Sequence, residues 1–157
     1  MIGLSHNNLT EESIMAANKG LDGVVKMNAS GSSVASLLNV TSFSLEETTE
    51  ILDVTSMDSA SNSREVIATF LSFTGTVEGY WDNSDARLNH TDSVDPVVKA
   101  GAAIDFELYP EGDTASDLYY SGSAIVTSVS RSQSFDGATQ YTINFDGNGP
   151  LGYDVAS

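Results

Sequence analysis

The 157-residue chain contains no cysteine, and this absence excludes a disulfide framework, a thiol nucleophile and cysteine-ligated zinc. Long apolar runs are absent too, because no stretch approaches the roughly 18 apolar residues of a membrane span. The N-terminus also lacks the basic segment and the apolar run of a signal peptide. These absences predict a protein that is made and folded in the cytoplasm and does not insert into a membrane.

Basic residues are scarce. The chain carries 6 Lys and Arg residues against 22 Asp and Glu residues, which gives a formal net charge of −16. Proteins that grip nucleic acid use clustered Lys and Arg side chains to displace counterions from the phosphates. The charge therefore excludes a groove-reading DNA-binding protein, and any contact with DNA must be non-adhesive.

Patterns typical of metal, phosphate and nucleophile sites are missing as well. His6 and His90 have no third ligand at metal spacing. The sequence at 146–149 begins like a calcium loop, but Pro150 takes the fifth ligand position. Neither Gly-x-Ser-x-Gly nor a glycine-rich phosphate loop occurs. We expect no metal and no cofactor.

Carboxylates are plentiful, so pairs suited to acid–base catalysis need a geometric test. Glu78 and Asp82 would stand roughly 13 Å apart along a straight strand, too far for a glycosidase pair. Asp105 and Glu107 would lie about 6.6 Å apart, which is permissible, but nothing around them favours the raised pKa of a general acid. The sequence favours a solvated strand face and no enzyme, and a hydrolase using Asp105 and Glu107 is the least favoured alternative.

Alternation of apolar and polar residues predicts a mainly β protein. The clearest run is 67–82, whose odd-numbered apolar residues are Ile67, Leu71, Phe73, Val77 and Trp81. Gly75 and Gly79 within it predict a bulge or bend in place of one long strand. Further strands are expected at 23–28, 34–46, 50–55, 103–109, 118–132 and 140–146. Seven or eight strands predict a β-sandwich or half-barrel. The expected core comprises Phe73, Val77, Trp81, Ile104, Phe106, Leu108, Ile143 and Phe145.

One helix is expected at about 93–101, where Ser93 can cap, Pro96 suits the first turn and Gly101 ends the helix. Residues 1–22 read as an N-terminal arm with a short helical pattern, and 23–157 as the β domain. A small, polar loop covers 56–63.

The order of these features resembles the tail tube (major tail) proteins of long-tailed bacteriophages over about residues 23–152. The resemblance rests on Phe43-Ser-Leu45, then 51–55, a polar loop, and Phe73-Thr-Gly75-Thr-Val-Glu-Gly79-Tyr-Trp81. It continues through the expected helix, the strand 104–108, Tyr120-Ser-Gly122 and Phe145-Asp-Gly147.

This resemblance implies a β-sandwich subunit with one flanking helix that assembles into a hexameric ring with a β-barrel lumen. Rings stack head-to-tail into the hollow tube of a virion tail, assembled in the host cytoplasm. The tube holds the tape-measure protein and conducts DNA during genome ejection. In the family a long hairpin reaches the neighbouring ring, and here about 45–64 matches it. The implied stacking loop comprises Ser56, Met57, Asp58, Ser59, Ala60, Ser61, Asn62, Ser63 and Arg64.

A conduit must let a polyanion slide, so a wall that bears carboxylates and hydroxyls and lacks Lys and Arg repels phosphates. The candidate lumen-facing acids are Glu78, Asp82, Asp105 and Glu107.

Two other interpretations stay open beside the hydrolase. One is an acidic carbohydrate-binding or adhesin β-sandwich, in which aromatic side chains stack on sugars. Its candidate residues are Tyr80, Trp81, Tyr119 and Tyr120. The other is a tube ring of a contractile secretion system, which shares the tail tube fold.

Overall fold

The computed structural model describes residues 23–58 and 63–157, so the predicted arm 1–22 lies outside the described residues. Eight strands are present in this part of the chain. They are β1 (Val24–Ala29), β2 (Ala35–Ser36), β3 (Val40–Asp53), β4 (Val66–Tyr80), β5 (Ala103–Tyr109), β6 (Leu118–Ser132), β7 (Gln140–Gly147) and β8 (Gly152–Val155).

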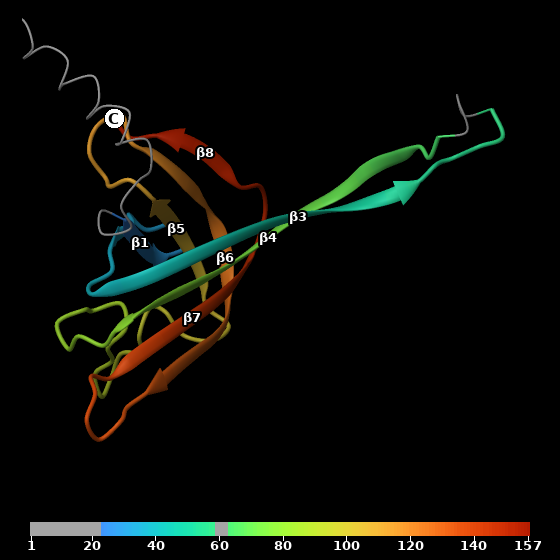
Figure 1. Cartoon of the computed structure of the whole chain (residues 1–157). Helices are drawn as coiled ribbons and strands as arrows, with labels where there is room; N and C mark the ends of the chain where they lie inside the picture. Colours follow the sequence, from blue (N-terminus) through green and yellow to red (C-terminus); the bar gives the residue numbers. More distant parts are fainter. Residues whose placement is uncertain (1–22, 59–62) are drawn as a thin grey trace, which may run out of the picture.

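The strands form one antiparallel sheet in the order β2-β1-β5-β6-β7-β4-β3, and β8 pairs with β6. Strand β6 changes partner along its length: its residues 118–121 pair with β8 and 124–132 with β7. The sheet curls into a half-barrel, so the layer that contains β1 and β5 lies behind β3, β4 and β7 (Figure 1). The predicted mainly β half-barrel is confirmed.

The core fills the space between the two halves of the curled sheet. Phe106 lies near its centre, with ring centroids 5.7 Å from Phe73 and 4.9 Å from Phe145. Of the residues expected in the core, those that are buried are Phe73, Val77, Ile104, Phe106, Leu108, Ile143 and Phe145. Trp81 differs: it is half-buried and packs against the core from the edge, under the Arg131 guanidinium at 5.2 Å.

Strand β4 is one continuous strand from Val66 to Tyr80, so the glycines do not divide it as predicted, although a β-bulge or irregularity in β3 lies opposite Gly79. The irregularities in its pairing with β3 fall between Val40 and Ser42 and between Thr49 and Ile51. Gly75 has a packing role instead, because a Cβ there would overlap the ring of Phe145 on β7. The glycine gives the aromatic ring room, which the sequence pattern could not distinguish from a bend.

The predicted helix at 93–101 is wrong as well, because this described segment consists of turns and bends. A helix would pair the Val98 N–H with the Val94 carbonyl. The Val98 N–H instead donates to the Arg87 carbonyl (3.0 Å), and the Val94 carbonyl accepts from Thr91 (3.0 Å). Pro96 also disfavours helical dihedrals at the residue before it, Asp95. Buried Val98 thus ties the segment to the preceding loop.

Candidate functional site

A long two-stranded hairpin, formed by the second half of β3 and the first half of β4, projects from the body (Figure 1). Strand β7 pairs with β4 only from Thr74 onward. Residues 66–73 of β4 therefore have β3 as their one strand partner in the described structure. We call residues 50–55 and 64–71 the stem of this hairpin and 56–63 its tip.

The stem exposes apolar side chains on both of its faces. Leu52 is paired with Ile67, and the next pair, Asp53 with Val66, points to the opposite face. The apolar stem residues are between 40% and 74% exposed, and they are Ile51, Leu52, Val54, Val66, Ile67, Phe70 and Leu71. The sequence pattern had placed Ile67 and Leu71 with Phe73 on a buried face, and for the isolated subunit this is wrong.

Polar contacts close the stem where the tip begins. The Arg64 guanidinium lies 3.0 Å from the Asp53 carboxylate, and the Glu65 N–H donates to the Thr55 hydroxyl at 2.9 Å. Hydrogen bonds from the hydroxyl and N–H of Thr55, and from Arg64, lower the pKa of Asp53. Of the predicted stacking loop, the described residues Ser56, Met57, Asp58, Ser63 and Arg64 are exposed. Ser59, Ala60, Ser61 and Asn62 lie outside the described residues.

The outer face of β3, β4, β7 and β6 carries rows of small polar side chains, which we call the hydroxyl face. One row consists of Ser42, Glu78, Thr142 and Ser130, the next of Ser44, Thr76, Asn144 and Ser128, and a third begins with Glu46, Thr74 and Asp146. The Ser42 hydroxyl donates to Glu78 (3.1 Å) and the Thr76 hydroxyl to Asn144 (2.8 Å). No Lys or Arg occupies these described positions.

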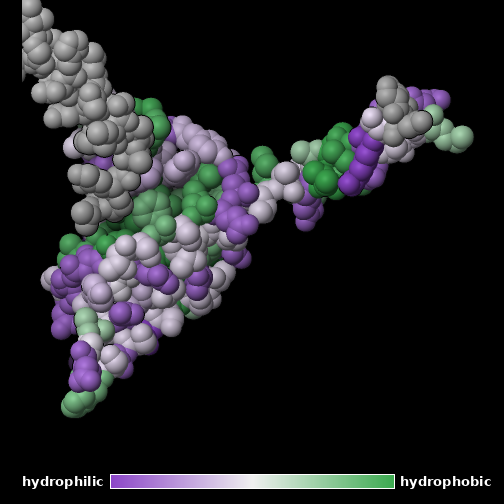
Figure 2. Space-filling model, viewed as in Figure 1, coloured by the Kyte–Doolittle hydropathy of each residue, from purple (hydrophilic) through white to green (hydrophobic). Residues whose placement is uncertain are grey.

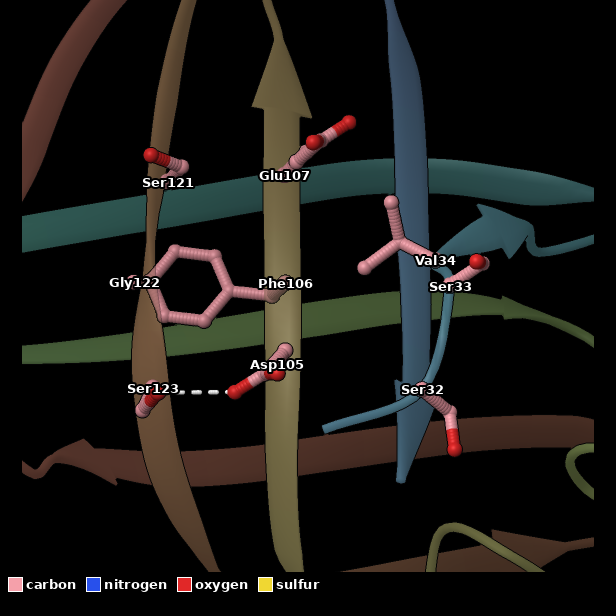
Figure 3. Close-up of a pocket in the computed structure, with 9 residues that line it drawn as sticks. All are labelled: Ser32, Ser33, Val34, Asp105, Phe106, Glu107, Ser121, Gly122 and Ser123. Atoms are coloured by element: carbon pink, nitrogen blue, oxygen red, sulfur yellow. Dashed lines mark hydrogen bonds between the residues drawn. The ribbon is translucent and has the colours of Figure 1, made fainter. Parts of the chain in front are cut away.

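The outer face of β1, β5 and β6 holds the two other candidate acids, Asp105 and Glu107. They line a shallow pocket of about 520 Å³ beside the turn that leads into β2 (Figure 3). Asp105 accepts hydrogen bonds from the Gly31 N–H (2.9 Å) and the Ser123 hydroxyl (2.7 Å). These bonds favour the ionised form and lower the pKa of Asp105.

This environment does not suit general acid catalysis, which requires a raised carboxyl pKa. Glu107 accepts a hydrogen bond from the Tyr109 hydroxyl at 2.7 Å, and burial together with this bond raises the pKa of Tyr109. Lys26 faces Glu107 across the β1–β5 pair and lies 3.1 Å from Asp113. Both pocket carboxylates therefore accept hydrogen bonds from groups of the protein itself.

Asp82 lies beyond the end of β4 and does not share a strand face with Glu78. Its carboxylate accepts from the Ser84 hydroxyl (2.6 Å), the Ser84 N–H (2.8 Å) and the Asn39 amide (3.0 Å). The two bonds from Ser84 come first among the causes that lower its pKa. Asp82 thus organises the turn that follows β4.

The four aromatic residues proposed as a sugar platform are not brought together on one surface. Tyr119 stacks on Tyr109 with centroids 4.7 Å apart on the outer face of β5 and β6. Tyr120 points to the other side of the sheet and meets Tyr153 edge-on at 5.7 Å. The Arg131 guanidinium lies over the Trp81 ring, and Tyr80 is the last residue of β4.

Asp85 is a structural residue that sequence reasoning missed. It is almost fully buried, and its carboxylate accepts from the N–H groups of Leu38 and Arg87 (3.0 Å each) and from the Arg87 guanidinium (3.1 Å). The bond from Leu38 joins the loop after β4 to the turn that precedes β3. An acid in a loop without apolar periodicity gives no signal of burial.

Within residues 23–58 and 63–157, no group of three or more His, Cys, Asp and Glu side chains is arranged to hold a metal ion. The same residues include no helix of the length and apolarity that crossing a membrane requires.

Comparison with known proteins identifies a family that the sequence matches. The sequence model of the family described as "Phage tail tube protein" matches residues 17–153. Comparison with curated proteins gives no match.

Solved structures share the fold. A chain from the tail of an empty gene transfer agent particle, refined with C6 symmetry, is 20% identical, with a TM-score of 0.65 over 88% of this chain and 100% of that chain. A chain of the SPP1 tail tube is 16% identical, with a TM-score of 0.63 over 88% of this chain and 80% of that chain. A chain of the anti-feeding prophage baseplate is 6% identical, with a TM-score of 0.59 over 90% of this chain and 96% of that chain. Since the family match spans most of the sequence, the chain belongs to the phage tail tube protein family and has a structural role in a tail tube.

Proposed function

We propose that copies of this chain form hexameric rings that stack head-to-tail into the hollow tube of a virion tail. The observation that supports this most strongly is the shared fold with a C6-symmetric tail over 88% of the chain. In the part of the chain that the structure describes, three strands have only one strand neighbour each and so form edges of the sheet, and these are β2, β3 and β8. Open edges are templates for joining one subunit's sheet to the next, and head-to-tail contacts that close by rotation make rings.

The hydroxyl face is the part of the surface best suited to line the lumen. Its rows carry hydroxyl, amide and carboxylate groups without a described Lys or Arg, whereas the opposite outer face includes Lys26. A wall of this kind repels phosphates and offers DNA no ionic grip. Among the four candidate acids, we therefore propose that Glu78 faces the lumen and that Asp82, Asp105 and Glu107 lie away from it.

The proposed partners are those that membership of the tail tube family implies. In the assembled tail the lumen holds the tape-measure protein and later conducts DNA during ejection, without sequence-specific binding. The subunit is synthesised in the host cytoplasm, resides in the virion tail and has no catalytic role. The stacking loop, residues 56–64, contacts the neighbouring ring.

A ring of a contractile secretion system is the alternative assembly, favoured by the fold similarity to the anti-feeding prophage baseplate. Location of the chain in a virion separates the two assemblies.

Electron microscopy of the purified full-length protein and of the virion tests the proposal. We expect hollow tubes with sixfold rings from the purified protein and labelling of the tail shaft by antibodies against it. Monomers that persist at high concentration, together with absence of the protein from the tail shaft, would contradict it.

A further inference from the structure

Asn148 is the one asparagine of the sequence that precedes a glycine, and it lies in the short connection between β7 and β8. This connection lies where the hairpin leaves the body (Figure 1), and hydrophilic residues gather on that part of the surface (Figure 2). Asn148 itself is exposed. Asn-Gly pairs are common in tight turns, because both residue types accept a positive φ.

The turn does not use this property of asparagine at position 148. Gly149 has a φ of +109°, whereas the described residues other than glycine that have a positive φ are Asn39 and Ser116. The Asn148 N–H holds the backbone in place by donating to the Ser123 carbonyl at 2.8 Å. Any residue except proline could supply that bond, so the backbone conformation does not explain the asparagine.

The side chain of Asn148 also differs from those of the other described asparagines in its hydrogen bonds. The other side-chain amides all bond to groups of the protein, and they belong to Asn28, Asn39, Asn83, Asn89 and Asn144. Neither the Asn148 amide nor the Gly149 N–H has a hydrogen-bond partner among the described residues. The described part of the fold therefore restrains neither group.

The space around Gly149 is open as well. A Cβ built on Gly149 would meet no atom within 4 Å other than those of its chain neighbours. Glycine also carries no side chain that could shield its own nitrogen. The Gly149 nitrogen is therefore accessible to the carbonyl carbon of the Asn148 side chain.

We propose that Asn148-Gly149 is a site of spontaneous deamidation in the folded protein. The Gly149 nitrogen loses its proton and attacks the carbonyl carbon of the Asn148 side chain, which forms a C–N bond and closes a succinimide ring. The side-chain nitrogen takes up a proton and leaves as ammonia. Water then opens the ring at either carbonyl, releases a proton and gives aspartate or isoaspartate. The reaction needs water alone and does not depend on self-assembly.

Conversion changes both the charge and the length of the connection. Either product adds one negative charge to a chain that already carries −16. Isoaspartate also inserts a methylene group into the main chain between residues 148 and 149. The connection is fixed at both ends, because a Cβ on Gly147 would overlap the Phe73 ring and Gly152 pairs with Ser121 on β6.

Peptide mass spectrometry of the full-length protein, aged in mildly alkaline buffer, tests the proposal. Deamidation raises the mass of a peptide because OH replaces NH₂. One sample is kept folded and a second is unfolded in guanidinium chloride. We expect the Asn148 peptide to convert in the folded sample at a rate within about tenfold of its rate in the unfolded sample, since the described fold restrains neither reacting group.

Asn83 is the matched control in the same chain, because it is exposed as well. Its side-chain oxygen accepts from the Trp81 indole (3.3 Å), and the N–H of the next residue, Ser84, donates to Asp82 (2.8 Å). These two bonds must break before the Asn83 site can react. Folding should therefore slow conversion of the Asn83 peptide by more than about tenfold.

Two variants identify the reacting residue. Asn148→Gln keeps a neutral amide, but attack would have to close a larger ring, so this variant should form no acidic species on isoelectric focusing over the same period. Asn148→Asp is one of the products and marks the position of the converted protein. An Asn148 peptide that stays intact in the folded sample while the unfolded sample converts would overturn the proposal. The same acidic species accumulating in Asn148→Gln would also overturn it.

Discussion

At the scale of the residue, a few polar side chains hold this subunit together where the sheet does not. Asp85 carries a negative charge into the interior and is satisfied by Arg87 and by the Leu38 backbone. Asp105 is held by the Gly31 N–H and the Ser123 hydroxyl. Each carboxylate joins a loop to a strand, so each links the local chain to the tertiary fold.

Replacement Asp85→Asn removes the ionic partner of Arg87 inside the protein. We expect a loss of about 2–4 kcal/mol in the free energy of unfolding, near the range for a broken buried pair. Urea unfolding followed by circular dichroism measures it. The matched control is Asp95→Asn, which breaks the exposed pair with Lys99 and should cost less than about 1 kcal/mol. Equal losses in both variants would show that Asp85 is not a structural anchor.

Asp105 should make stability depend on pH. Its folded pKa lies below the ordinary value of 3.8, so the stability that its ionised form contributes is present above that value and is lost as pH falls through the lowered pKa. Asp105→Asn should therefore be less stable than the parent above pH 4, with a difference that shrinks in more acidic solution. Unfolding measured between pH 2 and 6 checks this. Ser123→Ala removes one donor and should give an intermediate profile; a pH-independent difference for Asp105→Asn would contradict the prediction.

At the scale of the element, the hairpin consists of two parts, the stem and the tip, that differ in composition. Its stem is apolar, and its described tip residues are exposed outside the body. None of the described tip residues, 56–58 and 63, belongs to the hydrophobic core. Folding of the subunit and stacking of rings should therefore be separable by mutation.

Deleting residues 57–62 should leave the melting temperature within a few degrees of the parent, because the deletion leaves the stem contacts Arg64–Asp53 and Glu65–Thr55 in place. We expect rings that stack poorly into tubes. Thermal unfolding and electron microscopy give the two readouts. Tubes of normal length would refute a stacking role for the tip, and a collapsed melting temperature would refute its independence from the fold.

Period-two patterns predicted the strands because burial of one strand face imposes alternation, as at Ile104, Phe106 and Leu108. The same pattern could not reveal whether an apolar face is covered by the chain itself or by another copy, so Ile67 and Leu71 were misplaced. The helix at 93–101 failed for a different reason. Cap and proline signals depend on neighbouring residues only. The Val98 N–H instead donates to the Arg87 carbonyl of the preceding loop, which these signals cannot reveal.

At the scale of the whole molecule, charge and shape act together. Copies that each carry −16 repel one another, so the contacts that join them must outweigh this repulsion. Salt screens the repulsion over a length of about 10 Å at 0.1 M ionic strength and less at higher salt. The balance between these forces should set when the tube forms.

Assembly should accordingly strengthen with salt. We expect the protein concentration needed for tube formation to fall as sodium chloride rises from about 0.02 to 0.5 M, because repulsion is screened and apolar contacts are not weakened. Light scattering and sedimentation measure this threshold. Tubes that dissolve as salt increases would contradict this prediction, because they would indicate that ion pairs between copies hold the tube together.

Reversing charge on the hydroxyl face should impede DNA passage. Glu78→Lys puts one cation per subunit on the proposed lumen wall, where it can bind phosphates. Virions with this change should keep intact tails and release DNA more slowly than the parent. Glu107→Lys, on the opposite outer face, is the matched control and should leave ejection unchanged. A reversed pattern would assign the lumen to the other face.

The open edges of the described sheet also favour closed assemblies over open ones. When the sheet edge of one copy joins the opposite edge of the next copy, any open chain of copies ends in two bare edges, whereas a closed ring leaves neither edge exposed. Incomplete rings therefore carry a fixed penalty that the final copy removes. Partial assemblies should be scarce in solution, and the population should divide between free subunits and complete rings.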